Sequence, residues 1–410
     1  MLAADDAVLA RRDPAVPGLA TVLDPAAVAE RLRRLLPGAE TAQPTYVRYK
    51  PGSSCLVAYR VESDRGVLPC YAKAYSRPEK LQKLHQPGPT LGFADELIGV
   101  AVFPYDRALP SLGRLVDAPG RQRLLSGLLG DGWWQGSVRL IRYKPERRLV
   151  ARFEGEEHPP LLLKFYDQPG YATADRAARS FRSQGVLRAP RRLGGSARHR
   201  VLALEWVIGQ PLSEGLGGTP DRSLMDVGAA LAAFHRQRPD GLPARHRTEE
   251  AAAISSGARA VAALDPSQAE GARQLAAGVS GPLLGAPELP VATHGDFAPD
   301  QILLNGARVA IVDYDRAMIG DPAADLGSFA ARLEVEVLEG RLGRARAAEV
   351  LAAVLSGYRE AGGTDPSPRL PAYTAAGLLR LAAEPFRYRM RHWPERMRSM
   401  LARAAEVRAR

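Results

Sequence analysis

Two acidic segments carry the residues of this chain whose types and spacing could do chemistry. Residues 294–301, His-Gly-Asp-Phe-Ala-Pro-Asp-Gln, form a compact loop sequence that contains Asp296. After one short predicted strand come residues 311–315, Ile-Val-Asp-Tyr-Asp, which contain Asp313. Transfer of a phosphoryl group needs a base beside the acceptor hydroxyl and oxygen ligands that hold Mg²⁺ on the phosphates. Two carboxylates at this spacing suit those two tasks, with Asp296 as the base.

The first segment resembles the catalytic loop of the aminoglycoside phosphotransferase family, relatives of the protein kinases, whose pattern is His-Gly-Asp-x-x-x-x-Asn. The resemblance implies that Asp296 accepts the proton of the acceptor hydroxyl and that the residue five positions later ligates Mg²⁺. That residue is Gln301 here instead of Asn. Its amide oxygen is still a hard ligand, but the extra methylene moves it by about one bond length. A Gln at this position is similar to the maltokinase and glucosamine kinase branch of the superfamily.

The second segment and its continuation, residues 320–326 (Gly-Asp-Pro-Ala-Ala-Asp-Leu), resemble the aminoglycoside branch. This resemblance implies that Asp313 is the main metal ligand. A His-Gly-Asp tripeptide alone is most often a turn, so the second segment at the right distance is what favours catalysis. We expect His294, grouped with the catalytic residues, to organise the loop by bonding to backbone near Asp313. Asp325 is expected either to cap a helix or to hold the backbone of the loop.

Length and composition indicate a globular protein with more than one domain. The 410 residues are 46% hydrophobic and 25% charged, which predicts two or three domains. The start of the chain lacks the pattern of a signal peptide and no run of 18 residues is apolar, so we expect a cytoplasmic protein without a membrane partner. Cys55 and Cys70 fit a reducing compartment. The net charge of +11 is spread along an Arg- and Ala-rich chain, so no nucleic-acid partner is expected.

An internal repeat occupies the first half of the chain. Short motifs occur twice in the same order: residues 47–51 and 141–145, residues 56–58 and 149–151, and residues 73–75 and 164–166. Two copies of one supersecondary unit are therefore predicted. Alternating apolar residues within each copy indicate an antiparallel meander. Such a meander resembles the small lobe of the kinase-like fold.

The second copy leads into segments that resemble the nucleotide site of the family. Residues 205–212 follow a predicted strand and resemble the hinge, where backbone groups pair with adenine, so Glu205 and Val207 are predicted cofactor contacts. Lys164 is the candidate for the phosphate-binding lysine; the alternative is a strand-edge lysine that faces water. Lys73 holds the equivalent place in a copy that leads to no catalytic loop. We therefore expect Lys73 to be dispensable for ATP binding.

The turn at residues 144–148 lacks the glycines that let backbone amides approach phosphate. Arg147 or Arg148 could reach the phosphates with a guanidinium group, and an exposed basic turn is the alternative. In the helix that follows Lys164, the only candidate for an acidic partner of that lysine is Asp175. In the first copy, residues 102–107 and Pro110 are interpreted as a remnant of a hinge.

The rest of the chain is predicted to be mainly helical. Residues 221–237 place apolar side chains at spacings of three and four, which predicts an amphipathic helix, and further helices are predicted at residues 350–358 and 373–407. Related kinases build the acceptor pocket from their C-terminal helices. By that resemblance the candidate acceptor contacts, which could equally be core or surface residues, are Glu384, Arg387, Tyr388, Arg391, His392 and Trp393.

These inferences predict an α+β protein with a bilobal kinase-like fold, a duplicated β-rich N-lobe and a mainly helical C-lobe. The predicted domains are residues 1–130, a degenerate copy that acts as a lid or support, residues 131–209, which bind nucleotide, and residues 210–410. The predicted activity is transfer of the γ-phosphoryl group of ATP, with Mg²⁺, to a hydroxyl of a sugar, amino sugar or aminoglycoside-like small molecule. The alternatives are an impaired pseudokinase that binds nucleotide or a partner, and a nucleic-acid-binding module that rests on charge alone.

Overall fold

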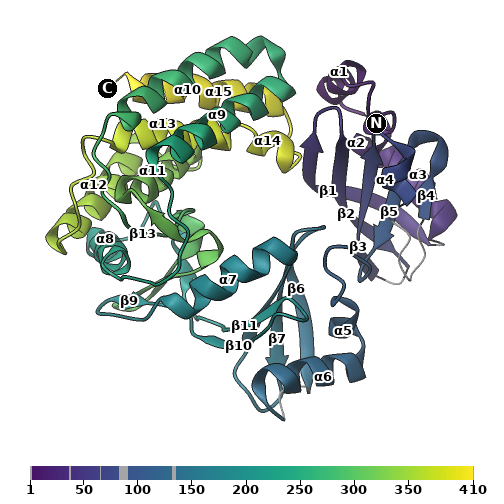
Figure 1. Ribbon diagram of the computed structural model, residues 1–410, viewed down its shortest axis with the longest axis horizontal. Coiled ribbons are helices and arrows are strands. Elements are labelled where there is room, and N and C mark those ends of the chain that lie inside the picture. Colours follow the sequence, from purple (N-terminus) through teal and green to yellow (C-terminus); the bar gives the residue numbers. More distant parts are fainter. Residues whose placement is uncertain (1, 37, 65, 83–90, 132–134, 410) are drawn as a thin grey trace. The chain divides into compact units, whose positions relative to one another are not determined.

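The computed structural model describes residues 2–36, 38–64, 66–82, 91–131 and 135–409, and it divides into two compact units. The first unit comprises Met1–Tyr171, Gly194–Ala203 and Glu384–Pro394, and the second comprises Ala172–Leu193, Leu204–Ala383 and Glu395–Arg410. As predicted, the fold is α+β, with sheets towards the N-terminus and helices towards the C-terminus (Figure 1). The predicted boundary at residue 130 lies inside the first unit, so both copies of the repeat belong to one compact unit.

The first copy builds an antiparallel sheet with the strand order β1-β2-β3-β5-β4. Helix α1 (Ala4–Arg12), helix α2 (Leu19–Leu23) and helix α3 (Pro25–Leu35) precede the sheet. Asp24 caps α3 by accepting hydrogen bonds from the next N–H groups of the helix. The remaining elements are β1 (Ala39–Lys50), β2 (Ser54–Ser63), β3 (Gly66–Tyr75), α4 (Pro78–Gln82), β4 (Leu91–Phe93) and β5 (Ile98–Val102).

The second copy repeats this arrangement with the strand order β6-β7-β8-β11-β10. Helix α5 (Gly113–Val116) and helix α6 (Ala118–Leu129) come first, and Asp117 caps α6 as Asp24 caps α3. The remaining elements are β6 (Gly136–Lys144), β7 (Arg148–Gly155), β8 (Leu161–Tyr166), α7 (Gln168–Ser180), β10 (Arg192–Ser196) and β11 (Val201–Glu205). The matching order of helices and strands confirms the predicted duplication.

The strand register corrects one detail of the sequence alignment. Lys73 pairs with Leu56 in the first sheet, and Lys164 pairs with Val150 in the second. Both lysines stand two residues before the end of the third strand of their sheet. Leu56 is therefore equivalent to Val150, one residue away from the Leu149 that the sequence match indicated.

The repeat begins earlier than the sequence analysis proposed. Residues 13–17, Asp-Pro-Ala-Val-Pro, match residues 106–110, Asp-Arg-Ala-Leu-Pro, and each segment leads into the helix pair that precedes its sheet. Residues 106–110 therefore open the second copy. The segment also follows β5 as residues 205–212 follow β11, so its interpretation as a hinge-like remnant of the first copy stays a prediction.

In both copies an aspartate from the opening segment holds the turn between the first two strands. One oxygen of that aspartate accepts hydrogen bonds from a tyrosine hydroxyl of the first strand and from the N–H of a turn residue. That turn residue has a positive φ in each copy, +63° at Gly52 and +57° at Glu146. The donors and their distances to the acceptor oxygen are Tyr49 Oη (2.7 Å) and Gly52 N (2.8 Å) on Asp13, and Tyr143 Oη (2.8 Å) and Glu146 N (2.7 Å) on Asp106.

The second unit packs helices around a buried helix and two small sheets. One sheet has four strands, in the order β12 (Gln210–Pro211), β14 (Ile302–Asn305), β15 (Arg308–Ile311) and β9 (Leu187–Arg188), and β15 and β9 are parallel; the other is the antiparallel pair of β13 (Val291–Thr293) and β16 (Met318–Gly320). The predicted helix is α8 (Asp221–His235), and its apolar face is buried, with Phe234 stacked on Phe181 at 4.0 Å between ring centroids. Truncating such a buried aromatic costs about 3 to 5 kcal/mol. The other helices are α9 (Arg247–Leu264), α10 (Ala269–Leu284), α11 (Pro322–Leu338), α12 (Arg344–Glu360), α13 (Leu370–Leu381) and α15 (Trp393–Arg408). Among the described residues, no helix combines the length and apolar composition needed to cross a membrane.

The segment Glu384–Pro394 belongs to the first unit, although it lies near the C-terminal end of the chain. It contains the short helix α14 (Glu384–Arg387). The hydroxyl of Tyr388 accepts a hydrogen bond from Arg142 at 2.9 Å, and Trp393 Nε1 donates to Asp6 at 3.3 Å. Arg389 also forms an ion pair with the buried Asp6. Tyr388 and Trp393, predicted as acceptor contacts, thus tie this segment to the N-terminal part of the chain.

Candidate active site

The two acidic segments meet at the β14–β15 hairpin. Strand β14 (Ile302–Asn305) pairs with β15 (Arg308–Ile311), and β13 (Val291–Thr293) leads into the loop that contains Asp296. Because Ile302 lies opposite Ile311, the residues that flank this pair are also adjacent. The N–H of Val312 donates to the carbonyl of Gln301 at 2.9 Å. The hairpin therefore places the end of the loop beside the segment that carries Asp313.

His294 joins the loop to the Asp313 segment from inside the core. Its side chain is fully buried, and Nε2 lies 2.8 Å from the carbonyl oxygen of Val312. The N–H of Asp296 donates to Nδ1 of the same ring at 3.3 Å. These contacts require a neutral imidazole with its proton on Nε2. The bond to backbone next to Asp313 is the one expected of a loop organiser.

Asp325 holds the backbone of the loop, which is the second of the two roles expected for it. The carboxylate is 1% exposed and accepts hydrogen bonds from the N–H groups of His294, at 2.6 Å, and Gly295, at 2.9 Å. His235 Nε2 lies 3.0 Å from Asp325, and the other ring nitrogen of His235 lies 2.8 Å from the hydroxyl of Tyr358. Burial acts to raise the pKa of Asp325, but these hydrogen bonds and the histidines outweigh it and lower the pKa.

Gly295 allows the loop to touch the segment that carries Asp313. Its φ is +75°, and a Cβ at this position would lie 2.3 Å from the carbonyl oxygen of Arg316. A side chain is therefore excluded both by the backbone conformation and by contact with backbone. Glycine in the His-Gly-Asp sequence is a condition for placing Asp296 beside residues 313–316.

Asp296 is a half-buried carboxylate surrounded by arginines. Its oxygens lie 3.6 Å from Arg316 Nη1 and 3.7 Å from Arg380 Nη2, and the side chain is 32% exposed. Burial acts to raise the pKa of Asp296, but the charges of Arg316, Arg380 and Arg332 outweigh it and lower the pKa. Asp296 is therefore ionised at neutral pH. An ionised carboxylate can accept a hydrogen bond from a hydroxyl and orient its oxygen for attack.

Asp313 stands in a left-handed backbone conformation, with φ 68° and ψ 55°, at the start of a 3₁₀ turn formed by residues 314–316. Aspartate tolerates this conformation better than most residues, at a cost of about 1 kcal/mol. The side-chain Nε2 of Gln301 donates to Asp300 at 2.9 Å, which makes the amide oxygen the atom that could ligate a metal.

These two side chains fit a magnesium site of the kind that is completed by phosphates. Mg²⁺ is commonly held by one or two protein oxygens, with phosphate oxygens and waters supplying the rest. Asp313 and Gln301 offer one carboxylate and one amide oxygen. Within the described ranges, no group of three or more His, Cys, Asp or Glu side chains could hold a metal by itself. The donor set therefore suits Mg²⁺ bound together with a nucleotide.

Lys164 lies in the interior of the second sheet. Strand β8 has β7 on one side and β11 on the other, and Lys164 is 4% exposed. The alternative of a strand-edge lysine that faces water is therefore wrong. Asp175 accepts hydrogen bonds from Arg192 Nε at 2.7 Å and from Arg179 Nε at 3.0 Å. Both oxygens of this candidate partner are thus engaged by arginines of its own unit.

The predicted hinge is an irregular segment between β11 and β12 (Gln210–Pro211). The N–H of Glu205 donates to the carbonyl of Arg191 at 2.9 Å, and the Glu205 carboxylate pairs with Arg188 and Arg191. The carbonyl of Glu205 is therefore the group through which this residue could contact adenine. Val207 lies in the irregular stretch that follows, where the backbone belongs to no strand.

The basic turn of the second copy presents Arg147 to solvent and places Arg148 at the start of β7. The carbonyl of Arg147 accepts a hydrogen bond from the N–H of Asp167 at 2.8 Å, which ties the turn to the end of β8. Between these arginines and Pro145 lies Glu146, whose side chain is buried. The sequence analysis gave Glu146 no role.

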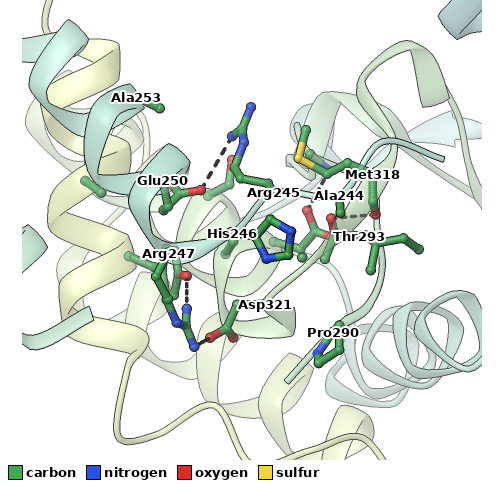
Figure 2. A pocket seen from close by; sticks show the side chains of 18 of the residues that line it. Ala244, Arg245, His246, Arg247, Glu250, Ala253, Pro290, Thr293, Met318 and Asp321 are labelled. Atoms are coloured by element: carbon green, nitrogen blue, oxygen red, sulfur yellow. Dashed lines mark hydrogen bonds and ion pairs between the residues drawn. The ribbon is translucent and has the colours of Figure 1, made fainter. Parts of the chain in front are cut away.

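A cavity of about 130 Å³, lined by both apolar and charged side chains, opens within the second unit beside the loop that contains Asp296. Four stretches of chain line it: residues 244–254, 288–295, 318–328 and 373–380. Thr293 and Gly295 contribute the start of the catalytic loop, and Arg380 links the cavity to Asp296. Figure 2 shows Arg245, Arg247 and Glu250 on the helical side of the cavity and Thr293 and Met318 on the strand side.

The charged groups of the cavity are paired with one another. Arg247 pairs with Asp321 at 2.7 Å, and Arg245 pairs with Glu250 at 3.5 Å, as the dashed lines of Figure 2 indicate. Asp321 also caps α11 through the N–H of Ala323. The wall therefore combines apolar side chains with paired charges that offer both hydrogen-bond donors and acceptors.

Residues 137–369 match the phosphotransferase enzyme family. The chain belongs to this family. The match begins at the second sheet and includes the catalytic loop, whereas the first copy of the repeat lies outside it. As a family member, the protein is a phosphotransferase that acts on hydroxyl acceptors.

Solved structures similar to the chain include choline kinase from Cryptosporidium parvum, with 12% identity, a TM-score of 0.51, and coverage of 72% of this chain and 96% of that chain. Another is a choline/ethanolamine kinase family protein from Mesorhizobium loti, with 21% identity, a TM-score of 0.48, and coverage of 66% of this chain and 87% of that chain. A third is an aminoglycoside phosphotransferase in a ternary complex with ADP and hygromycin B, with 15% identity, a TM-score of 0.49, and coverage of 70% of this chain and 97% of that chain. At such identities the likeness shows the fold alone. The sequence matches no curated protein.

Sequence reasoning missed several residues that organise the family's site in this chain. His235, at the end of α8, joins Tyr358 to the loop-holding Asp325. Sequence reasoning also looked for acceptor contacts in residues 384–393, while the cavity is lined by residues of the second unit. No local sequence pattern indicates the cavity, because the residues that line it come from four separate stretches of the chain.

Proposed function

We propose that the protein transfers the γ-phosphoryl group of ATP to a hydroxyl of a sugar, amino sugar or aminoglycoside-like acceptor, with Asp296 as the base. The observation that carries this proposal is the ionised, half-buried Asp296 beside a cavity with paired charges in its wall and next to the Asp313 segment. Membership of the phosphotransferase enzyme family supports the same reaction class.

In this reaction the acceptor oxygen forms a bond to the γ-phosphorus, and the bond from that phosphorus to the β–γ bridging oxygen breaks. The hydroxyl proton passes to Asp296. Because the pKa of Asp296 is lowered, its main contribution is to orient the hydroxyl, and it takes the proton late, when the acceptor oxygen has become acidic. His294 and Asp325 keep the loop in position and do not exchange protons with the substrate.

Lys164, with Arg147 or Arg148, would bind the phosphates, and backbone groups of Glu205 and Val207 would pair with adenine. Asp313 and Gln301 would hold Mg²⁺, which when bound neutralises charge on the phosphates. Support for the lysine comes from its burial in the middle of the sheet at the place equivalent to Lys73.

The cavity supports a small, hydroxyl-rich acceptor. Its volume of about 130 Å³ is below the roughly 300 Å³ at which pockets for drug-sized ligands begin, so it would take one ring or a similar fragment. Paired charges such as Arg245 with Glu250 can exchange their contacts for hydroxyl groups without leaving a net charge buried. A larger acceptor would place the rest of its structure outside this cavity.

Release of ADP from ATP and Mg²⁺ in the presence of a panel of sugars, amino sugars and aminoglycosides tests the proposal. We expect at least one acceptor to be phosphorylated, and Glu250→Ala to raise the KM for that acceptor while the KM for ATP stays unchanged. Binding of ATP without phosphorylation of any hydroxyl compound would instead favour the pseudokinase, which the Gln at position 301 and the glycine-free turn motivate.

A further inference from the structure

The carboxylate of Glu146, in the β6–β7 turn of the second copy, is bound by two cations of the first copy and by an arginine of the second copy's opening segment. Its Oε2 lies 2.6 Å from Lys73 Nζ and also contacts Arg48, and its Oε1 lies 2.6 Å from Arg107 Nε. The Glu146 side chain is 4% exposed and that of Lys73 is 7% exposed. We call Glu146 and these basic residues the Glu146 cluster. It joins β1 and β3 of the first copy, and the opening segment of the second copy, to one turn.

The backbone conformation of Glu146 is one that favours glycine, so the presence of a carboxylate at this position calls for an explanation. Its φ of +57° is a conformation that glycine adopts without strain, and the equivalent residue of the first copy is Gly52, with φ +63°. The N–H of Glu146 donates to Asp106 just as the N–H of Gly52 donates to Asp13. The second copy therefore keeps the turn and its aspartate but accepts backbone strain for the sake of a carboxylate.

The charges explain why the carboxylate is held firmly. Burial acts to raise the pKa of Glu146, but Lys73, Arg107 and Arg48 outweigh it and lower the pKa. Burial and the two guanidinium groups lower the pKa of Lys73 to about 8, against the opposing effect of Glu146, so Lys73 is still mainly protonated at neutral pH. Removing Glu146 would leave its cations facing one another in a largely buried space.

Lys73 is the structural counterpart of Lys164, yet its ammonium group binds the turn of the second copy. We propose that Glu146 is a positioning residue: the first copy holds it through Lys73 and Arg48, together with Arg107 of the second copy's opening segment, and so fixes the turn that carries Arg147 and Arg148 in the conformation that binds nucleotide phosphates. The nucleotide part of this inference rests on the proposed function, whereas the fixing of the turn does not. The first copy is then a support for the nucleotide site, and Lys73 is not dispensable.

A displacement of Glu146 also moves the two arginines that follow it, because they are its neighbours in the chain. Arg147 is the next residue after Glu146, and neighbouring Cα atoms are about 3.8 Å apart, so a displacement of Glu146 is passed directly to both arginines. Two further hydrogen bonds, from Asp167 N to Arg147 O at 2.8 Å and from Glu146 N to Asp106 at 2.7 Å, tie the turn to the second copy. The Glu146 cluster is therefore the side-chain link between the first copy and this turn.

The decisive variant is Glu146→Gly, because glycine is the residue that the first copy uses at this position and it removes the carboxylate without adding strain. We expect it to fold and to weaken the dissociation constant for ATP by about tenfold, the effect of losing one good charge-assisted contact, while kcat at saturating ATP changes less than about threefold. The matched control is Glu96→Gln, which removes a carboxylate that pairs with Arg31 within the first copy and does not touch the turn. It should leave ATP binding unchanged. Wild-type ATP affinity in a folded Glu146→Gly protein would overturn the proposal.

Hydrogen exchange of the backbone in residues 144–149, together with trypsin cleavage after Arg147, reports on the turn without requiring any activity. Both should become faster in Glu146→Gly and stay at the wild-type rate in Glu96→Gln. Unchanged exchange in Glu146→Gly would overturn the fixing of the turn. A wild-type protein that binds no ATP would overturn the proposed function instead, and the exchange result would still decide the role of Glu146.

Lys73→Met provides a second variant in case Glu146→Gly fails to fold. Glu146 then keeps Arg48 and Arg107, so we expect a smaller loss of ATP affinity, about three- to tenfold, and partial loss of protection in residues 144–149. Lys73→Arg should restore both because a guanidinium can replace the ammonium at this contact. Lys73→Met with wild-type ATP affinity and wild-type exchange would remove Lys73 from the mechanism.

Discussion

The two copies of the repeat share a scaffold and differ in the use of a few side chains. Both have the same order of helices and strands, and both have an aspartate that holds the first turn. In the first copy the turn carries Gly52 and the third strand carries a lysine that is bound to the neighbouring copy. In the second copy the turn carries Glu146, and the chain runs on to the catalytic loop.

The difference indicates that, in a duplicated unit, one copy can bind nucleotide while the other supports the turn of its neighbour. The contacts that fold the unit, such as those of Asp13 and Asp106, are alike in both copies. The new task depends on one carboxylate at a turn and on cations that the first copy supplies. The comparison therefore predicts that chemistry depends on the second copy and the loop that follows it, and that the first copy acts through the turn.

The largest effect should come from the loop that only the second copy leads to. Asp296→Asn should keep the fold and the affinity for ATP but lower turnover by about two to four orders of magnitude, the range for loss of a positioned base. Turnover and ATP binding should be measured on the same preparation. Equal turnover in the variant would mean that the chemistry does not run through this loop.

Replacing Lys164 should weaken the use of ATP more than replacing its counterpart Lys73. Lys164→Ala should weaken ATP use by roughly 1.5 to 3 kcal/mol, about ten- to 150-fold, because it removes a charge-assisted contact to phosphate. Lys73→Ala should cost less, since Lys73 acts through Glu146. ATP titrations of both variants decide the matter. A large loss at Lys73 with none at Lys164 would reverse the assignment of the copies.

Variants of the two proposed metal ligands, Asp313 and Gln301, should differ in how strongly they change the Mg²⁺ requirement. Asp313→Asn should raise the Mg²⁺ concentration for half-maximal activity by at least about tenfold, because Mg²⁺ relies on few protein carboxylates. Gln301→Asn, which introduces the residue of the family pattern, should change it by less than about threefold. A Mg²⁺ titration at fixed ATP measures both. A larger shift for Gln301→Asn than for Asp313→Asn would contradict the predicted order of the ligands.

The smallest effect concerns the charge around Asp296. Its pKa is lowered by Arg316 among other arginines, so the ionised form that the reaction needs persists as the pH falls below the usual value for aspartate. Arg316→Gln removes one positive charge and should raise that pKa. The acid limb of the kcat–pH profile should then move to higher pH, with little change near pH 7. A limb that stays in place would show that Asp296 does not control it.

The sequence predicted features that depend on neighbours in the chain. The catalytic loop, the second acidic segment and the lysine of the second copy each stand in a local pattern, so they could be found without knowing the fold. The amphipathic helix at residues 221–237 was also predictable, because its spacing alone assigns the buried face. The opening of the repeat at Asp13 was visible only as five residues and was overlooked.

Contacts between distant residues could not be predicted in this way. Glu146 is separated from Lys73 by 73 positions, and no local pattern indicates that a carboxylate in a basic turn is buried. The tie between His235 and Asp325 spans 90 positions and exists only because two helices pack together. Residues 384–393 looked like a pocket lining by resemblance, but Tyr388 and Trp393 are bound to the first unit.

The ion pair between Asp6 and Arg389 also governs the order in which this chain can fold during synthesis. The two residues are 383 positions apart. The first unit therefore includes a segment, Glu384–Pro394, that is synthesised close to the end of translation. Until residue 389 has emerged, the carboxylate of Asp6, which is fully buried in the finished protein, has neither Arg389 nor Trp393 beside it. Contacts between such distant residues form late, so α1 gains these partners only after residues 172–193 and 204–383 of the second unit have been synthesised. Helix α1 is therefore the region of the nascent chain with the longest wait for its native partners.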